Sequence, residues 1–335
     1  MVTVHDVAAR SGVSIATVSR TLREPHRVSE DTRDRVLEAV RDLGYRPNRA
    51  ASSLRRGRTG VIALVVPDIE NPYFSSLTKG AQAISRQRGY GLVVVDTTES
   101  ADVEADEIRA LRSQIDGVIL ASSRLSDEGL AEIAAETVCV LVNRDLSHLG
   151  VPAPTVTIDE DAGGRAAIGH LHDLGHRRVA YVGGPARSWS EGRRSRALRT
   201  AAAQYAGLVL SEFGGFAPDG NGGRDAADQV LAAEPTAVIA YNDLVALGLL
   251  ARWSESGVRV PDDISLLGFD NTFVAELASP RITSVGADLR EFGEQSVELL
   301  LERIDGHASA GAEAHRQLTP KLAIRASTAP PSSAR

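Results

Sequence analysis

Polar side chains follow several short apolar runs in the second part of the chain. The sets are Asn71, Tyr73 and Phe74 after VIALVVPD, Ser122 and Ser123 after GVILA, Asn242 and Asp243 after AVIAY, and Asp270 and Asn271 after ISLLGF. Carboxylates, carboxamides and hydroxyls together suit the hydroxyl groups of a small polar ligand. Ligands bind open α/β sheets at the carboxyl ends of strands, so these positions predict a binding site. Two alternatives stay open: Asp243 also fits a helix cap, and Phe74 also fits a core position.

Patterns typical of catalysis or metal binding are incomplete. The glycine pairs at 163–164, 183–184 and 222–223 are not followed by the Lys-Ser/Thr of a phosphate-binding loop. His172 and His176 are four residues apart, but no acidic partner completes an H-E-x-x-H motif. We therefore expect no catalytic residue, no metal and no cofactor.

The elements that must position the polar residues are strands and helices in alternation. Short apolar runs separated by amphipathic segments predict parallel sheets with right-handed crossovers. Two such sheets fit the length of residues 60–325, with lobe one at about 60–158 plus 288–325 and lobe two at about 159–287. The chain would cross between the lobes more than once, and a cleft between them is the expected site. The tail at 326–335 is expected to be disordered because of its composition.

Charge is distributed unevenly along the 335 residues. The net charge is −7, but residues 1–58 carry +5 and the remainder −12. A basic segment on an acidic body suggests a polyanionic partner. The first ten residues lack the apolar run of a secretory signal, no stretch approaches a membrane span, and the one cysteine, Cys139, excludes an internal disulfide. These features predict a soluble cytoplasmic protein.

The basic segment at 1–46 divides into three short helices. Thr3 and Asp6 form a variant of the capping box before a helix that ends near Ser11. Gly12 permits a tight turn, and Ser14 caps a second helix over residues 15–22. The third helix follows Ser29, with Val36, Leu37, Val40 and Leu43 on one stripe, and ends at Gly44. Helix, turn and helix in this order are typical of a small DNA-reading module.

The segments VHDVAARSGVSIATVSRTL and VSEDTRDRVLEAVRDLGYRPNRAASSL resemble the headpiece of the lactose-repressor (LacI/GalR) family of bacterial transcription regulators. The resemblance implies that the second helix enters the DNA major groove, with Ile15, Ala16 and Arg20 at base-contacting positions. Arg20 can pair with guanine O6 and N7, whereas Ile15 and Ala16 can read only shape or a thymine methyl. A salt bridge is the alternative role of Arg20. The DNA-contact set predicted for the headpiece is Ser14, Ile15, Ala16, Thr17 and Arg20.

The segment at 47–59 joins the headpiece to the body. Its run of about eight helix-compatible residues is shorter than the ~12–15 that an isolated helix needs in water. A flexible basic linker is one interpretation. The resemblance implies instead a hinge helix that forms in the minor groove when two subunits lie side by side, with Leu54 wedged between base pairs. The DNA contacts predicted there are Asn48, Arg49, Ala51 and Leu54.

Blocks such as DLGHRRVAYVGGP and RVPDDISLLGFDN extend the resemblance through the body, which implies the fold of periplasmic sugar-binding proteins. Matching residue by residue places Arg194, Asn242 and Asp270 at ligand-contacting positions, with Ser190 nearby. Trp189 and Phe216 become possible stacking surfaces, although the segment around Phe216 appears a residue or two longer than the usual loop. The effector-binding set predicted from position and resemblance together is Tyr73, Phe74, Ser122, Ser190, Arg194, Asn242 and Asp270.

The expected architecture is a small all-α helix-turn-helix domain followed by a two-lobed α/β domain with parallel sheets. The expected function is that of a homodimeric transcription regulator, and we expect it to be a repressor. Its affinity for a palindromic operator would depend on a small polar effector, a sugar or nucleoside before an amino acid. Two rival classes are a solute-binding receptor, which the DNA-reading segment contradicts, and an enzyme acting on a sugar or nucleotide.

Overall fold

The computed structural model describes residues 2–45, 58–151, 153–306 and 315–332. Contacts divide the chain into two compact units, Met1–Gly60 and Val61–Arg335, which we call the headpiece and the body. The predicted hinge contacts Asn48, Arg49, Ala51 and Leu54 lie outside the described residues.

The headpiece is a three-helix unit with a small apolar core. Its elements are α1 (Val4–Ser11), α2 (Ile15–Arg23), the 3-10 turn η1 (Pro25–Arg27) and α3 (Glu30–Asp42). The predicted capping box is present, since the Thr3 side chain accepts from Asp6 N and Asp6 Oδ2 accepts from Thr3 N. The core residues are Val7, Ala8, Val18, Val36 and Ala39. Leu37 was wrongly assigned to the buried stripe: it is exposed on α3, and Ala39 takes the inner position.

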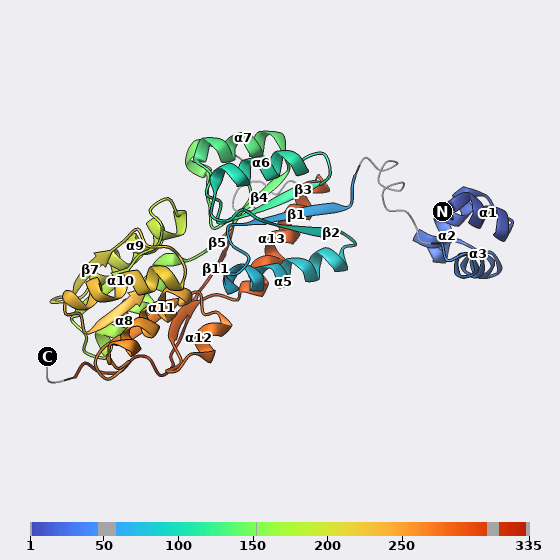
Figure 1. Ribbon diagram of the computed structural model, residues 1–335. Coiled ribbons are helices and arrows are strands. Elements are labelled where there is room, and N and C mark those ends of the chain that lie inside the picture. The colour runs from blue at the N-terminus through green and yellow to red at the C-terminus, as the bar shows by residue number, and fades with distance from the viewer. Residues whose placement is uncertain (1, 46–57, 152, 307–314, 333–335) are drawn as a thin grey trace. The chain divides into compact units, whose positions relative to one another are not determined.

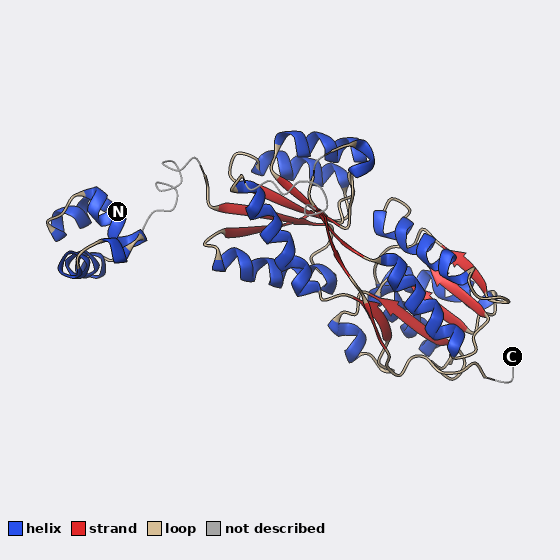
Figure 2. Cartoon of the chain, turned by 180° about the vertical axis from the view of Figure 1, so that it is seen from behind, coloured by secondary structure: helices blue, strands red, loops and turns tan. Residues whose placement is uncertain are grey.

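The body contains two six-stranded sheets, one in each lobe (Figures 1 and 2). Lobe one has the strand order β11-β5-β4-β3-β1-β2, with all neighbours parallel. Its strands are β1 (Val61–Val66), β2 (Gly91–Asp96), β3 (Gly117–Ala121), β4 (Cys139–Val142), β5 (Thr155–Ile158) and β11 (His315–Leu318).

Lobe two repeats the arrangement with the order β12-β10-β9-β8-β6-β7. Only β12 runs antiparallel to its neighbour. The strands are β6 (Arg178–Val182), β7 (Val209–Phe213), β8 (Ala237–Ala240), β9 (Ser265–Phe269), β10 (Thr283–Gly286) and β12 (Lys321–Ala323). The predicted fold class, a helix-turn-helix domain followed by a two-sheet parallel α/β domain, is confirmed.

Helices cover both faces of each sheet. In lobe one, α5 (Pro72–Gln87) and α13 (Leu289–Ile304) pack on one face, and α6 (Ala101–Leu111) and α7 (Asp127–Glu136) on the other, where a 3-10 turn η2 (Ser147–Leu149) follows β4. In lobe two, α8 (Glu160–Asp173) and α9 (Trp189–Ala202) cover one face, and α10 (Gly220–Ala232), α11 (Asp243–Glu255) and the short α12 (Phe273–Leu277) cover the other.

The glycine pairs that failed as phosphate loops have a packing role. Helices α8 and α9 approach so closely at Gly164 that a Cβ there would lie 2.9 Å from the carbonyl carbon of Ala197. Gly223 has the same role between α10 and α11, where a Cβ would lie 2.1 Å from the oxygen of Val245. A side chain at either position would force the helix pair apart.

The chain passes between the lobes after β5, after β10 and after β11. The last crossing corrects the predicted boundary, which assigned residues up to 325 to lobe one. Strand β12 instead pairs with β10, for example Val285 with Leu322, and therefore belongs to lobe two. A three-residue strand with half-buried side chains gives little signal in the sequence.

The tail predicted to be disordered is ordered over residues 326–332. Ser327 is fully buried, its Oγ donates to Leu266 O over 2.5 Å, and Leu266 N donates to Ser327 O over 2.8 Å. His176 in turn contacts Ala329 O through Nε2 at 2.9 Å. Composition was a poor guide because these backbone groups of lobe two supply the partners that order the segment.

Candidate functional site

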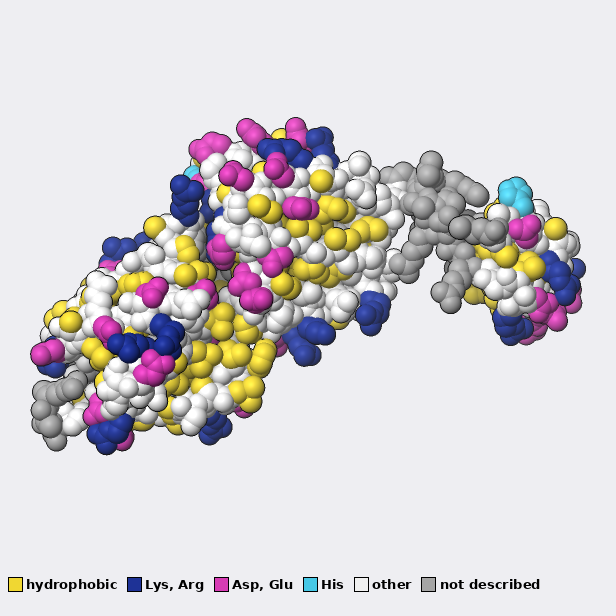
Figure 3. Space-filling view, viewed as in Figure 1, with side chains coloured by type: hydrophobic (Ala, Val, Ile, Leu, Met, Phe, Trp, Pro, Cys, Tyr) yellow, Lys and Arg dark blue, Asp and Glu magenta, His cyan; other side chains and the backbone are white. Residues whose placement is uncertain are grey.

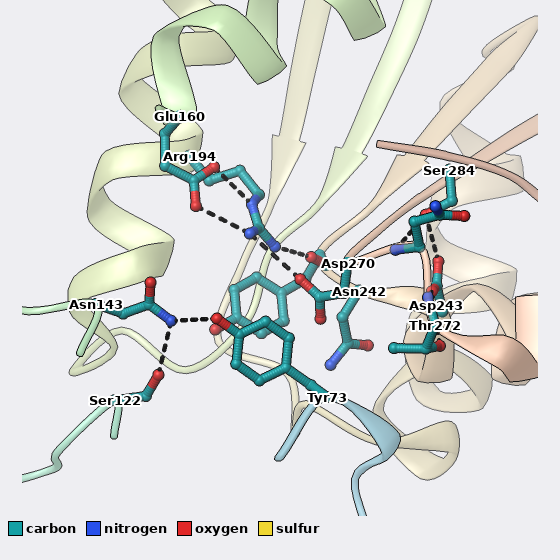
Figure 4. Close-up of polar contacts among 12 residues, drawn as sticks. Tyr73, Ser122, Asn143, Glu160, Arg194, Asn242, Asp243, Asp270, Thr272 and Ser284 are labelled. Atoms are coloured by element: carbon teal, nitrogen blue, oxygen red, sulfur yellow. Dashed lines mark hydrogen bonds and ion pairs between the residues drawn. The ribbon is translucent and has the colours of Figure 1, made fainter. Parts of the chain in front are cut away.

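All seven residues predicted to bind an effector line one cavity between the lobes of the body. Figure 4 labels Tyr73, Ser122, Arg194, Asn242 and Asp270 among them. Tyr73 and Phe74 come from the start of α5, and Ser122 from the end of β3. Ser190 and Arg194 come from α9, whereas Asn242 and Asp270 follow β8 and β9. The free space left among these side chains is about 30 Å³, roughly the volume of one water molecule.

On the lobe-one side, three polar side chains are linked by hydrogen bonds. Asn143 donates through Nδ2 to the Tyr73 hydroxyl over 2.6 Å and to Ser122 Oγ over 3.1 Å. Asn71 caps α5 by accepting from Tyr73 N, which fixes the start of the helix that carries Tyr73. Burial and the nearby Asp270 raise the pKa of the Tyr73 hydroxyl well above its ordinary value, so this group stays protonated.

Three of the lining residues that directly follow a strand have a backbone conformation that favours glycine. The φ angles are 50° at Ser122, 54° at Asn143 and 89° at Asp270. Each directly follows the carboxyl end of a strand, and its side chain lines the cavity. Non-glycine residues in this region cost about 1–3 kcal/mol each and cluster at functional sites, which supports a binding role for this edge.

On the lobe-two side, a buried arginine joins two carboxylates. Arg194 donates from Nε and Nη2 to the two oxygens of Glu160, each over 3.0 Å, and Nη2 also lies 3.5 Å from Asp270 Oδ1. Its Nη1 donates to the backbone oxygen of Tyr241. The side chains of Arg194 and Glu160 are each 6% exposed. Glu160 and Arg194 meet because Gly164 permits the close approach of α8 and α9.

Burial controls the protonation of this cluster. Desolvation raises the pKa of Asp270 to about 7; the guanidinium of Arg194 opposes the rise, and the carboxylates of Asp243 and Glu160 add to it. Burial also opposes the charge of Arg194, but Glu160 and Asp270 outweigh it and raise the pKa of the guanidinium well above its ordinary value. Arg194 therefore stays charged, and Asp270 is the group that exchanges a proton near neutral pH.

A second arginine lines the cavity from lobe one. Arg124 donates to both carboxylate oxygens of Glu99, over 2.5 and 2.9 Å, and to Ser122 O over 2.8 Å. Neither Arg124 nor Glu99 was predicted as a site residue. Asn143, Glu160 and Tyr241 also line the cavity and were missed. Asn143 and Glu160 stand just beyond β4 and β5, so the same strand-end rule would have found them.

Several predicted positions have other roles. Asn242, rather than Asp243, caps α11 by accepting from Val245 N, and it also donates to Pro218 O. Asp243 is buried outside the cavity, where it accepts from Thr272 N and from Ser284 Oγ. The residues Ser123, Trp189, Phe216 and Asn271 are not among those that line the cavity. Phe74 both lines the cavity and belongs to the core of lobe one.

The residues of the second headpiece helix that were predicted to contact DNA differ in their exposure. Ser14 caps α2 by accepting from Thr17 N, and the two hydroxyls lie 2.9 Å apart. Ile15 packs partly against the core, whereas Ala16 is exposed. Arg20 is exposed, and no ion pair or hydrogen bond joins its guanidinium to the parts of the chain that the structure describes. The salt bridge considered for Arg20 is not formed there, so the guanidinium is available to an external acceptor.

A helix-turn-helix headpiece joined to a two-lobed body with a polar cavity defines a DNA-binding regulator with a ligand-binding domain. The comparisons agree. Residues 3–48 match the family described as bacterial regulatory proteins, lacI family, and residues 168–328 match the periplasmic binding protein-like domain. The HTH-type transcriptional regulator DegA of Bacillus subtilis (strain 168) is 33% identical over 341 residues, covering 98% of both chains. This chain therefore belongs to the lacI family of bacterial regulatory proteins and is a DNA-binding transcription regulator.

Solved structures agree over the whole length. The lac repressor dimer bound to operator and the anti-inducer ONPF has a TM-score of 0.85 at 26% identity, covering 98% of this chain and 99% of that one. A complex of the transcriptional regulator CelR with cellobiose has a TM-score of 0.70 at 31% identity, covering 98% and 100%. Among the described residues, no helix is long and apolar enough to cross a membrane, and no group of three or more His, Cys, Asp or Glu could hold a metal ion.

Proposed function

We propose that this chain is a homodimeric transcriptional repressor whose affinity for a palindromic operator is controlled by a small polar effector bound in the cavity. The observation that carries the proposal is the convergence of all seven predicted residues, from both lobes, on one buried polar site. The proposal includes no chemical step, in keeping with relatives that are transcriptional regulators. A sugar fits the hydroxyl-binding groups, and CelR, a structural neighbour, is described in complex with cellobiose.

Control would operate by a shift between two lobe arrangements. Ligand pockets commonly enclose about 300–1,000 Å³, far more than the free space of about 30 Å³ found here. An effector therefore requires the lobes to separate or the lining side chains to move. A ligand that prefers one arrangement shifts the population toward it, and the same coupling changes operator affinity. The proposed route to DNA is the 47–59 segment, which lies in the sequence between α3 and β1.

Dimerisation has candidate surfaces on the body. The edge strand β2 exposes Val93 and Val94, and α12 exposes 57% of Phe273 and 77% of Leu277. Figure 3 shows apolar side chains gathered over both regions on one face. Contiguous exposed apolar surface commonly marks an interface, and we propose a second copy of the chain as the partner that covers these regions. Arg20 of each α2 would read a base in each half-site.

The test uses the full chain and an operator selected from random DNA by the protein itself. Operator affinity is measured by fluorescence anisotropy at fixed salt, with and without each compound of a sugar and nucleoside panel. We expect one compound to change operator affinity at least tenfold in the wild type and to have no effect on Asp270→Ala. That variant should keep its operator affinity within twofold when no compound is added. If no compound changes operator affinity, the proposed control is wrong; if Asp270→Ala still responds, the site is misplaced.

A further inference from the structure

Among the residues that the structure describes, the charged side chains that line the cavity are two arginines and three carboxylates. The cations are Arg194 and Arg124, and the anions are Glu160, Asp270 and Glu99. When all five are ionised, the lining carries one excess negative charge. A fourth carboxyl group, Glu104, lies directly behind Arg124, whose backbone N donates to it over 2.9 Å. The cavity therefore has no surplus of positive charge to offer a ligand.

The charge of Arg194 is already neutralised by its own chain. A guanidinium has five N–H donors, and the structure assigns four of those in Arg194, two to Glu160, one to Asp270 and one to Tyr241 O. The Glu160 contact is a parallel pair of bonds, the strongest geometry for an arginine and a carboxylate. An incoming anion would have to displace a carboxylate that is itself 94% buried, since its side chain is 6% exposed.

Arg124 is held in the same way on the opposite wall. Its Nε and Nη2 donate to Glu99, its Nη1 donates to Ser122 O, and its side chain is 8% exposed. The two cations at the cavity are thus each locked in a bidentate pair. An anion entering between them would lose its hydration and gain no unpaired cation, a transfer that proteins avoid.

The groups that remain available are neutral or acidic. Within the described residues, no hydrogen bond joins Asp270 Oδ2, Asn143 Oδ1 or Ser190 Oγ to another part of the chain. Asn143 Oδ1 can only accept, and so can Asp270 Oδ2 when its carboxyl group is ionised, so both then suit the hydroxyl donors of a polyol. A phosphate or carboxylate brings only acceptor oxygens and would face acceptors.

From this arrangement we infer that the effector is an uncharged, hydroxyl-rich compound and that the cavity excludes phosphorylated and carboxylated forms of the same compound. The inference rests on the proposed function, because it assumes that the cavity is the effector site. The inference separates free sugars and nucleosides from sugar phosphates and nucleotides. The sequence alone does not make this distinction.

Arginines without such partners lie outside the cavity. An exposed groove between α8 and α9 is lined by Arg165, Arg193 and Arg196, and among the described residues none of these three forms an ion pair. Arg193 instead lies 5.3 Å from the ring centroid of Trp189. Weak binding of an anion to this groove must be distinguished from binding in the cavity, and the double variant Arg165→Gln with Arg196→Gln serves that purpose.

The experiment compares matched pairs of compounds on the full chain. Isothermal calorimetry measures ribose against ribose 5-phosphate, glucose against glucose 6-phosphate, cellobiose against cellobiose 6-phosphate, and adenosine against adenosine monophosphate. We expect the uncharged member of the active pair to bind and its phosphorylated partner to bind at least a hundredfold more weakly, about 2.7 kcal/mol. Asp270→Ala should abolish binding of the uncharged member.

Two variants should weaken the discrimination of the cavity against phosphorylated compounds. Glu160→Gln releases the charge of Arg194, and Glu99→Gln releases that of Arg124, so in either variant the affinity ratio between the uncharged and the phosphorylated compound should fall at least tenfold. Glu212→Gln removes a carboxylate that contacts Ser195 and Arg199 outside the cavity and should leave the ratio unchanged. Circular dichroism verifies that each variant is folded. Because the two variants act on different arginines, the test still works if one of them fails to fold.

The outcomes are distinct. A phosphorylated compound that binds the wild type as tightly as its uncharged partner, and loses binding in Asp270→Ala, overturns the inference while the proposed function stands. A phosphorylated compound that binds as well but loses binding only in the Arg165 and Arg196 double variant occupies the exposed groove, and the inference for the cavity holds. If no member of any pair binds, the proposed function fails and the inference fails with it.

Discussion

The headpiece and the cavity use the same side chain in opposite ways. Arg20 on α2 is exposed and has no partner in the described part of the headpiece, whereas Arg194 on α9 is buried and makes four hydrogen bonds. DNA brings its own acceptors in phosphates and base edges, so a protein that reads DNA must leave its donors free. The cavity instead supplies acceptors from within the chain, and Arg194 binds two carboxylates of its own lobe. The exposed Arg20 is therefore free to bind an external acceptor, whereas Arg194 is a structural centre of the cavity.

The largest expected effect tests this contrast at Arg194. Arg194→Met removes the cation between Glu160 and Asp270 and leaves carboxylates buried without a partner. Breaking a buried ion pair in this way typically costs about 3–5 kcal/mol. We expect urea unfolding monitored by circular dichroism to show a loss of that size in the body. Arg196→Met, at an exposed position two residues later on α9, is the control and should change stability by less than about 0.5 kcal/mol.

Adding Glu160→Gln to Arg194→Met removes one of the carboxylates left without a partner. The double variant should therefore regain part of the lost stability. If Arg194→Met alone is as stable as the wild type, Arg194 is not the structural centre, and its contrast with Arg20 disappears.

The two regions also differ in how far the sequence predicts them. The second helix was predicted at 15–22 and occurs at Ile15–Arg23, because Ser14 and Gly12 fix its start by local hydrogen bonding and turn geometry. Apolar runs likewise located the buried strands. The edge strands β7, β11 and β12 were missed, since their side chains are partly exposed and show no apolar run.

The cavity could be predicted as a set of positions but not as a network. Strand ends and family resemblance identified seven lining residues, yet nothing local to Arg194 shows that Glu160, 34 residues earlier, takes two of its donors. That pair depends on the close contact of two helices at Gly164. Partners set by tertiary contact cannot be deduced from composition or spacing, and they decide whether an arginine is free.

The next effect concerns the proton on Asp270. Its pKa is raised to about 7 in the folded protein, against about 3.9 in an unfolded chain. A carboxyl group whose pKa is higher in the folded than in the unfolded protein stabilises the folded state in its protonated form. This contribution to stability is fully present below the pKa of the unfolded state and is lost as the pH rises through the pKa of the folded state. Asp270→Asn removes this loss, so its stability relative to the wild type should increase by roughly 2–3 kcal/mol between pH 5 and pH 8. Urea unfolding at both pH values measures the difference.

Asp228→Asn is a matched control for that experiment. Asp228 is exposed on α10, and its hydrogen bond from Arg252 lowers its pKa. The pH dependence of Asp228→Asn should therefore have the opposite sign. As the pH rises from acid values, this variant should lose stability relative to the wild type. A constant difference between Asp270→Asn and the wild type across pH 5 to 8 would show that Asp270 stays ionised in the folded protein.

A smaller effect is expected at Arg20, the free counterpart. Arg20→Ala should weaken operator binding by about 1–3 kcal/mol per half-site and relax the preference at one G·C pair. Folding stability should stay within about 0.5 kcal/mol of the wild type, because no partner in the described headpiece is lost. Anisotropy titrations against the selected operator and against random DNA separate the possibilities. An equal loss on both DNAs would make Arg20 a phosphate contact.

Arg35→Ala is the matched control for the DNA experiment. Arg35 lies on α3 at 3.7 Å from Asp31, outside the helix predicted to read bases. It should leave the ratio of specific to random binding unchanged.

The smallest effect extends the comparison to the C-terminal segment, where Ser327, like Arg194 in the cavity, is buried and has its partners within the chain. Ser327 Oγ donates to Leu266 O and accepts from Thr283 N over 2.8 Å, so Ser327→Ala leaves two backbone groups of lobe two without this partner. The expected cost is about 1 kcal/mol in urea unfolding. Ser332→Ala changes the same residue type five positions later at an exposed site and should cost nothing measurable. Equal behaviour of the two variants would mean that the segment adds nothing to lobe two. A loss confined to Ser327→Ala would show that the contacts of Ser327 with Leu266 and Thr283 make this segment part of the fold of lobe two.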